Sequence, residues 1–308
     1  MIGTTVIFIF VQLPQKKQFM LNIGLIGNTE ILEPFVKRLR ENKNINIIGK
    51  TTVGIYSHLD SFHYTIPELN RIELIERADV LIMDNSSLLP VKILSEIVKK
   101  SKHVFTAGYL NLTIEECTQI VKLANESGSV VQVSNPFFFT PAIQWLNNNI
   151  SSPVYLDVLD FTGIHNHNNN LLYPIILMLL ELTGISPKKV GAVTFNSNPN
   201  KSDFTNVRLE FGDASVVNIS YGTLESLEEF KIRVYSRNQF INLNFTRNSF
   251  ICNNNPIDLS GFETVSEIDY FIDTIQNKTR GKSCLEDYLI AMYLVQKINK
   301  KITQFFAQ

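Results

Sequence analysis

The first residues that could do chemistry lie in the turn Gly27-Asn28-Thr29-Glu30, which joins an apolar stretch to an amphipathic one. A strand–turn–helix of this kind binds a pyrophosphate through the pattern G-x-G-x-x-G, because glycines let the phosphates approach the backbone. Here only the first glycine is present. Glu30 also places a carboxylate near the helix N-terminus, where it stabilises the helix but would repel a pyrophosphate. Gly27, Asn28 and Thr29 are therefore candidates for cofactor binding, and an ordinary turn capped by Asn28 or Thr29 is the favoured interpretation.

Two further strand ends carry candidate cofactor-binding residues. Asp84, Asn85 and Ser86 directly follow the apolar run VLIM, and Asp84 and Asn85 could equally cap the next helix. Thr52 stands near the end of the second expected strand, where an acidic residue usually holds the adenosine ribose. A threonine cannot supply that charge, so the ribose contact is weakened at this position.

A third turn, Ala107-Gly108-Tyr109, follows the next apolar strand. Ala107 and Gly108 are candidates for contact with a cofactor, because ligands of open α/β sheets bind at the carboxyl ends of the strands. Tyr109 carries a phenol that could act as a general acid. A packed aromatic ring with its hydroxyl at the surface is the more common role for such a residue.

The elements that must position these turns follow an alternating pattern. Thr113 and Glu116 form a capping box at the start of one helix, and Gly128 is placed to end it. Strands separated by helices of this length indicate βαβ units, and hence a parallel sheet covered on both faces. The sequence therefore predicts an α/β, doubly wound Rossmann domain over residues 20–136. Its strands are expected at 22–27, 45–48, 80–83, 103–105 and 130–133.

The second half of the chain, residues 137–308, changes to an α+β pattern. Gly212-Asp213 indicates a hairpin turn, so the sheet should be open and mainly antiparallel. One face of such a sheet needs burial, which favours a homodimer or higher homo-oligomer formed through it. The expected strands are 154–161, 189–195, 206–211, 215–221, 230–235 and 240–245, and the expected helices are 171–182, 264–276 and 285–300. The residues expected on the uncovered face are Val216, Ile219, Tyr221, Ile232 and Val234.

Composition limits the partners and the location. The formal net charge is −1 and no basic face is concentrated in the sequence, which argues against nucleic acid and against an anionic membrane. The apolar run near residue 6 is too short for a membrane span and is poorly flanked for a signal peptide. The three cysteines are far apart, as expected for reduced thiols in the cytoplasm, and they show no metal-type spacing. No metal site is expected, and no function is placed on residues 1–19.

Five short strings follow one another along the chain: Ala78-Asp79-Val80, His103-Val104-Phe105, Val131-Gln132-Val133, Phe139-Thr140-Pro141-Ala142 and Phe271-Ile272-Asp273-Thr274-Ile275. Taken in their order, they resemble the Gfo/Idh/MocA family of NAD(P)-dependent sugar and inositol dehydrogenases. The resemblance covers nearly the whole chain from about Asn22. It implies NAD or NADP as the cofactor, a small-molecule ligand in the interdomain cleft, and an oligomer made through the second sheet.

The chain departs from the family where that family does its chemistry. The lysine of the family's E-K-P motif falls on Gly108, which has no side chain to replace it. The histidine and aspartate of the following domain fall on Pro174 and Leu177, and His165 just upstream is the imidazole that could substitute. The run Phe137–Phe139 stands where the family often has an arginine, and packing between the domains is its favoured role.

Two functions remain open from the sequence. The first is an oxidoreductase-like protein with a degraded nucleotide loop, weakly active or non-catalytic, that serves as a binding or scaffold protein. The second is an active NAD(P)-dependent oxidoreductase of a sugar-like alcohol that uses an atypical acid or base, Tyr109 or His165. Because the phosphate loop, the ribose acid, the lysine and the histidine are lost together, the first is favoured.

Overall fold

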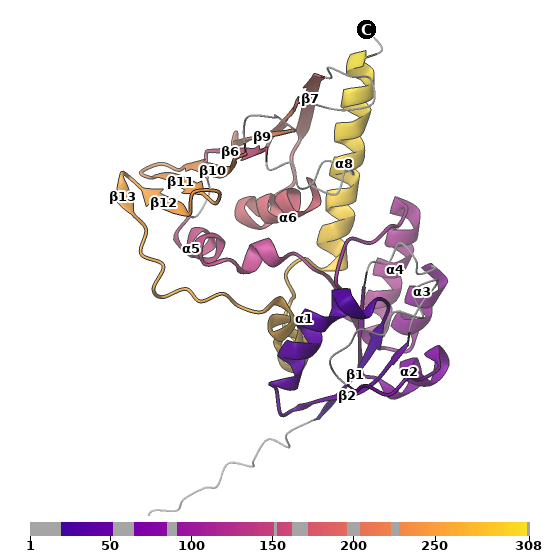
Figure 1. The fold of residues 1–308 in the computed structure, drawn as a ribbon. Helices are drawn as coiled ribbons and strands as arrows, with labels where there is room; N and C mark the ends of the chain where they lie inside the picture. Colours follow the sequence, from indigo (N-terminus) through magenta and orange to yellow (C-terminus); the bar gives the residue numbers. More distant parts are fainter. Residues whose placement is uncertain are drawn as a thin grey trace, which may run out of the picture.

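The computed structural model contains two sheets, one in each half of the chain (Figure 1). It describes residues 20–51, 65–84, 91–150, 153–161, 172–195, 204–222 and 228–306. Four of the expected site residues lie outside these ranges, namely Thr52, Asn85, Ser86 and His165. The expected fold class, a Rossmann domain followed by an α+β domain with an open, mainly antiparallel sheet, is confirmed.

The first sheet has five strands, all paired in parallel. Its strand order reverses at β1, which lies between β2 and β3, so the carboxyl ends of β1 and β3 form the usual ligand-binding point of such a sheet. In spatial order the strands are β2 (Ile45–Thr51), β1 (Leu21–Ile26), β3 (Val80–Met83), β4 (His103–Thr106) and β5 (Val131–Val133).

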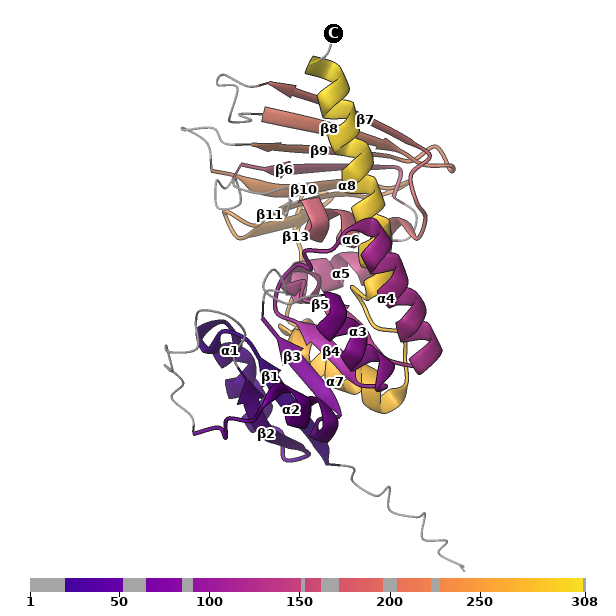
Figure 2. The same ribbon diagram turned by 90° about the vertical axis from the view of Figure 1, so that its right-hand side faces the viewer.

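Helices cover both faces of this sheet. Successive strand residues point to opposite sides, and the apolar ones on each side pack against helices. Val104 of β4 packs in one apolar cluster and its neighbour Phe105 packs in the other. The Val104 side is covered by α2 (Arg71–Arg77), α3 (Val91–Lys99) and α4 (Ile114–Ser127). The Phe105 side is covered by α1 (Thr29–Arg40) and α7 (Glu267–Asn277). In Figure 1 the strands of this sheet lie between α1 on one side and α2, α3 and α4 on the other, and Figure 2 views the sheet from the side of α2, α3 and α4.

Helix α4 shows how local sequence sets an element's bounds. The Thr113 hydroxyl accepts from the Glu116 N–H, and the Glu116 carboxylate accepts from the Thr113 N–H, which is the expected capping box. Gly128 ends the helix at a φ of 70°, a left-handed conformation that glycine adopts without strain. Both expectations from the sequence are confirmed.

The second sheet has eight strands, and all its pairs are antiparallel except β6 with β9. A 3₁₀ turn, η2 (Pro136–Phe139), leads into it, and α5 (Pro141–Asn149), α6 (Leu172–Thr183) and α8 (Leu285–Phe306) pack on one side (Figure 1). In spatial order its strands are β13 (Asn255–Pro256), β12 (Ser249–Cys252), β11 (Phe240–Asn244), β10 (Phe230–Tyr235), β6 (Tyr155–Asp160), β9 (Val216–Gly222), β8 (Phe204–Glu210) and β7 (Lys189–Phe195).

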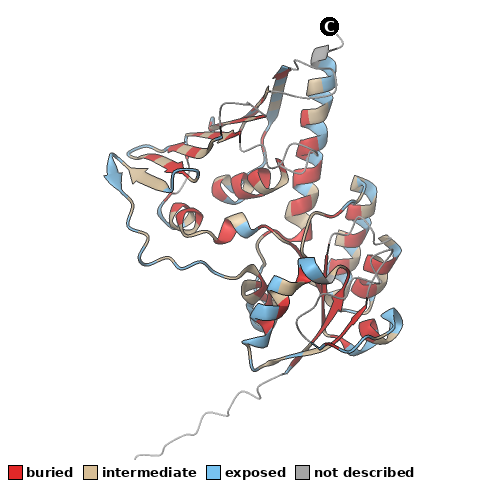
Figure 3. Ribbon diagram, in the orientation of Figure 1, coloured by how far each residue is buried: buried red, intermediate tan, exposed pale blue. Residues whose placement is uncertain are grey.

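The expectation of which side chains lie on the uncovered face was wrong. Ile219, Ile232 and Val234 are fully buried in the core beneath the helices, and Tyr221 lies on that same side. Figure 3 shows buried residues in red along the strands of this sheet and on the helices that pack on it. Val216 does lie on the uncovered face, because it is an odd number of residues from Ile219. A period of two identifies two faces of a strand but does not say which of them the helices cover.

The last two helices tie the halves of the chain together. Ring contacts join Phe271 of α7 to Phe105 of β4, with centroids 5.5 Å apart. Helix α8 begins beside β5 and α4 of the first domain and ends along β7 of the second (Figure 2). Among the helices of the described ranges, none has both the length and the apolar character needed to cross a bilayer.

Truncating Phe271 tests the role of α7. Phe271 is on α7 and is fully buried against α1 and β4. Phe271→Ala should therefore lower the free energy of unfolding by about 3–5 kcal/mol. Tyr293→Ala on α8, where the side chain is 45% exposed, is the control and should cost far less. Denaturant unfolding followed by circular dichroism gives both values, and equal losses in the two variants would contradict the packing of α7 on the first sheet.

Candidate functional site

The three turns named from the sequence meet at the carboxyl edge of the first sheet. The Asp84 N–H donates to the Ile26 carbonyl (3.1 Å), which places the end of β3 beside the Gly27 turn. The Ala107 N–H donates to the Met83 carbonyl (2.6 Å), which adds the turn after β4. The turns that the sequence singled out therefore lie together at this edge, next to the point where the strand order reverses.

Gly27 holds a backbone conformation that no other residue would adopt easily. Its φ is 121°, in the region that favours glycine. A Cβ atom at this position would lie 2.2 Å from the Cγ of Asp84, which is closer than any real contact. The carboxylate of Asp84 thus packs directly against the Gly27 backbone.

Asn28 connects this carboxylate to α1. Its backbone N–H donates to the Asp84 Oδ2 at 2.6 Å, and its side-chain Oδ1 accepts from the Glu30 N–H at 2.8 Å. Asn28 is the N-cap of α1, as the favoured interpretation of this turn expected, and Thr29 is the first helical residue. Two of the N–H groups that could face an anion here are therefore bound by the chain's own oxygens.

Asp84 is the best-defined ionisable group of the edge. It is 5% exposed, and its carboxylate accepts the Asn28 N–H. Residues 85–90, which join it to α3, lie outside the described ranges, so its role as a cap of that helix stays a prediction. Burial raises the pKa of the Asp84 carboxyl above its ordinary value, and the bond from the Asn28 N–H partly opposes this.

The half-buried ring of Tyr109 belongs to a stack of three tyrosines. Its ring stacks on Tyr173 of α6 (centroids 5.7 Å apart) and on Tyr288 of α8 (6.5 Å), and those two rings are 5.0 Å apart. The Tyr288 hydroxyl donates to the Leu110 carbonyl at 2.9 Å, which fixes the stack to the turn after β4. No local pattern in the sequence predicts this stack, because its rings come from three distant segments.

The surroundings of Tyr109 disfavour ionisation of its phenol. Burial raises the pKa of Tyr109 well above its ordinary value, and the negative charge of Glu267 raises it further. The positions expected to hold a histidine and an aspartate offer no replacement. Leu177 is buried in the core, and the Pro174 carbonyl accepts a long hydrogen bond (3.4 Å) from the Asn135 side chain.

Glu267 is a site-edge residue that the sequence did not single out. Its carboxylate accepts from the Ser134 hydroxyl (2.7 Å) and from the Asn135 N–H (2.9 Å), at the carboxyl end of β5. Burial raises the pKa of the Glu267 carboxyl above its ordinary value, and these two hydrogen bonds only partly oppose that rise. Its position in the first turn of α7 was the only sequence signal, and that position alone does not indicate contact with β5.

The three phenylalanines after β5 pack as the sequence suggested. The Phe137 ring lies 5.1 Å from that of Phe230 and 5.2 Å from that of Phe245, both of which belong to the second sheet's side of the molecule. Phe138 is buried, and Phe139 packs on Tyr270 of α7 with centroids 5.2 Å apart. These contacts agree with packing between the domains in place of an arginine.

Two hollows of about 450 and 510 Å³ lie elsewhere, on either side of the segment 279–284 that precedes α8. Neither is lined by the three turns. Arg280 beside them pairs with Asp287 (2.9 Å), and Lys282 pairs with Glu181 (3.5 Å). Among the described residues, no three His, Cys, Asp or Glu side chains gather in a way that could bind a metal.

No protein-family model matches the chain, and no curated protein matches its sequence. Solved structures do match. UDP-N-acetylglucosamine 3-dehydrogenase GnnA from Acidithiobacillus ferrooxidans is 15% identical with a TM-score of 0.79, over 93% of this chain and 99% of that one. The WlbA dehydrogenase from Chromobacterium violaceum, solved with NADH and UDP-GlcNAcA, is 14% identical with a TM-score of 0.76, over 96% and 97%. Biliverdin reductase from Synechocystis, solved with biliverdin and NADP+, is 15% identical with a TM-score of 0.68, over 92% and 99%.

The chain has the fold of the Gfo/Idh/MocA dehydrogenases. The likeness extends over both domains, which confirms the fold that the sequence resemblance implied. At 15% identity it concerns architecture, and the chemistry of the site rests on the residues themselves.

The raised pKa of Asp84 predicts a pH-dependent stability. A folded-state pKa above the unfolded one means that ionisation opposes folding, so stability is lost as pH rises through the unfolded pKa of about 3.9 and beyond. Asp84→Asn keeps an acceptor for the Asn28 N–H and removes the charge. The variant should melt higher than the parent at neutral pH, and the difference should shrink on acidification.

Differential scanning calorimetry across this pH range measures the effect. Asp79→Asn is the matched control, because the Asp79 Oδ2 accepts the Asn22 N–H (2.9 Å) at the opposite end of the same two strands. A lower melting temperature for Asp84→Asn at neutral pH would show that the ionised carboxylate stabilises the turn, contrary to this prediction.

Proposed function

We propose that this protein is a non-catalytic, or at most weakly active, member of the dehydrogenase-fold proteins that serves as a binding or scaffold protein. The observation that carries the proposal is the environment of Tyr109, whose half-buried ring stacks on Tyr173 and Tyr288. A general base must lose its proton, and burial together with the charge of Glu267 raises the pKa of this phenol and disfavours that loss. Pro174 and Leu177, which stand where the family resemblance places a histidine and an aspartate, carry no ionisable group.

The edge of the first sheet formed by the three turns is the proposed ligand site. NADH and NADP+ appear with the structural neighbours WlbA and biliverdin reductase, which supports a nicotinamide dinucleotide as the ligand class for this edge. Gly27 permits close approach of a ligand to the backbone. The carboxylate of Asp84 on the Asn28 N–H opposes tight binding of a pyrophosphate, so weak binding of NAD or NADP is proposed.

The alternative is an active NAD(P)-dependent oxidoreductase that uses Tyr109 as a general acid. The raised pKa of Tyr109 favours this reading in one respect, since a phenol that stays protonated is ready to donate a proton. The two proposals differ in what the loss of the hydroxyl should do. Tyr109→Phe keeps the stacked ring and removes only the proton that could be transferred.

Turnover assays with NADH and NADPH separate the two proposals. With sugar alcohols and UDP-linked sugars as substrates, we expect no cofactor consumption above that of the free cofactor, in the parent and in Tyr109→Phe alike. Tyr155→Phe on the second sheet is the control for loss of a tyrosine hydroxyl. Turnover that falls by about 100-fold or more in Tyr109→Phe alone would establish an enzyme with a phenolic acid and end the non-catalytic proposal.

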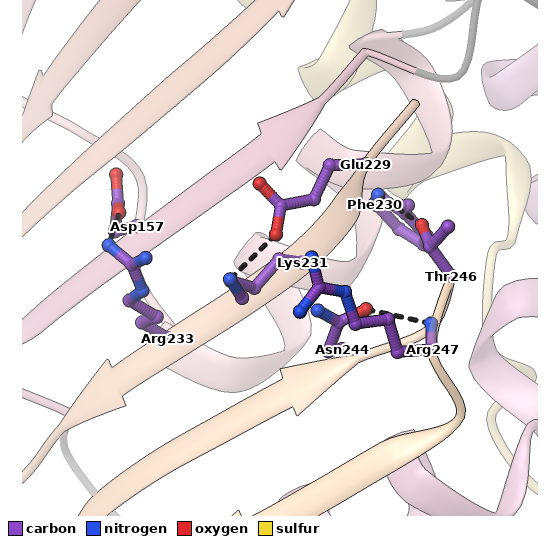
Figure 4. A network of polar contacts seen from close by, with 8 residues as sticks. All are labelled: Asp157, Glu229, Phe230, Lys231, Arg233, Asn244, Thr246 and Arg247. Carbon is purple, nitrogen blue, oxygen red and sulfur yellow. Dashed lines mark hydrogen bonds and ion pairs between the residues drawn. The ribbon is translucent and has the colours of Figure 1, made fainter. Parts of the chain in front are cut away.

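We further propose that the uncovered face of the second sheet joins two copies of the chain. This face carries charges that are already paired, as Figure 4 shows for Lys231 with Glu229 (2.7 Å) and Arg233 with Asp157 (3.4 Å). Partial burial raises the pKa of Asp157 above its ordinary value. The positive charges of Arg233 and Lys231 partly oppose that rise. A face whose charges are neutralised within one copy can meet an identical face across a two-fold axis without repulsion.

Tyr235 offers a test of this interface. It lies on the uncovered face of β10 and is 43% exposed, nearly the same as Tyr293 on α8 (45%). We expect the parent protein to be a dimer or higher oligomer by light scattering coupled to size exclusion, and Tyr235→Lys to shift it toward monomer. Tyr293→Lys should leave the oligomer unchanged. A parent protein that is monomeric at all concentrations would remove this proposal.

A further inference from the structure

Two aspartates bracket the central strand pair of the first sheet in matching ways. Asp79 precedes β3 and accepts the N–H of Asn22 in β1 (2.9 Å), whereas Asp84 follows β3 and accepts the N–H of Asn28 just after β1 (2.6 Å). The first contact lies at the amino end of the strands. The second lies at the carboxyl end, where ligands of such sheets bind.

At the carboxyl end, the Asp84 carboxylate lies where a phosphate group would lie in a phosphate-binding turn. It packs on the Gly27 backbone, and it accepts a turn N–H at the start of a 12-residue helix. Backbone N–H groups and the positive end of the helix dipole favour a negative charge there. A pyrophosphate bound in the usual way would need the same backbone surface, at the start of the same helix.

We propose that Asp84 is an internal anion that occupies this turn and selects against the pyrophosphate of a dinucleotide. The proposal deepens the proposed function and rests on it, because it names the residue that makes NAD(P) binding weak. The Asp84 carboxylate and a pyrophosphate at the same turn would both be negative, and like charges repel strongly in a partly desolvated site. The Asp84 carboxylate therefore acts by its charge, in addition to the space that it fills beside Gly27.

Charge and volume can be separated with two variants. Asp84→Asn removes the charge and keeps the shape, and its Oδ1 can still accept the Asn28 N–H. Asp84→Ser removes the charge and most of the volume. Asp79→Asn makes the same chemical change at the opposite end of the strands and serves as the control.

The experiment is calorimetric titration of NADH and NADPH into the parent protein and the three variants, with thermal melts to verify that each is folded. We expect both Asp84→Asn and Asp84→Ser to bind at least tenfold more tightly than the parent, and Asp79→Asn to bind like the parent. A gain in Asp84→Ser alone would show that volume, not charge, limits binding, and would overturn the proposal.

Absence of any gain in either folded Asp84 variant, including absence of binding in all four proteins, would also overturn it. These outcomes are distinct from failure of the proposed function. Cofactor turnover by the parent protein would end the non-catalytic proposal, while the ratio of affinities between Asp84→Asn and the parent would still decide the role of Asp84.

Discussion

The five-stranded parallel sheet carries apolar side chains on both faces, and both faces must be shielded from water. Strands about 4.8 Å apart make this sheet roughly 19 Å wide, whereas one helix covers about 10 Å. On the Phe105 side, α1 is the only helix that the first half of the chain supplies within the described residues. Helix α7, which follows the whole second sheet in sequence, returns to cover the rest of that face through Phe271 and its neighbours.

This return determines how the two domains are joined. The chain must leave β13, run back to the first domain for α7, and then continue into α8 (Figure 1). Helix α8 therefore starts against α4 and β5, which brings Tyr288 against Tyr109 and the N-terminal part of α6. The aromatic stack that holds Tyr109 is thus a consequence of covering the sheet, and it lies at the turn after β4.

The sequence predicted what depends on neighbouring residues and on periodicity. The strand–helix alternation, the capping box at Thr113 and the helix end at Gly128 are local, and all were found. The covered face of the second sheet was assigned wrongly, because alternation in β10 does not say where α5 and α6 pack. The contact between Asp84 and Asn28 and the stacking of Tyr109 on α8 join distant segments, and no local pattern encodes them.

Gly27 illustrates how a motif residue can be kept for a different physical reason. A glycine after the first strand is usually taken as the remnant of a phosphate-binding loop, because it lets a ligand approach the backbone. Here the group that approaches is the carboxylate of Asp84, whose Cγ would lie only 2.2 Å from a Cβ atom at this position. The glycine is needed for the fold whether or not a dinucleotide binds, so its presence is weak support for a cofactor. The residue at position 84 is more informative, since its charge sets what the turn can accept.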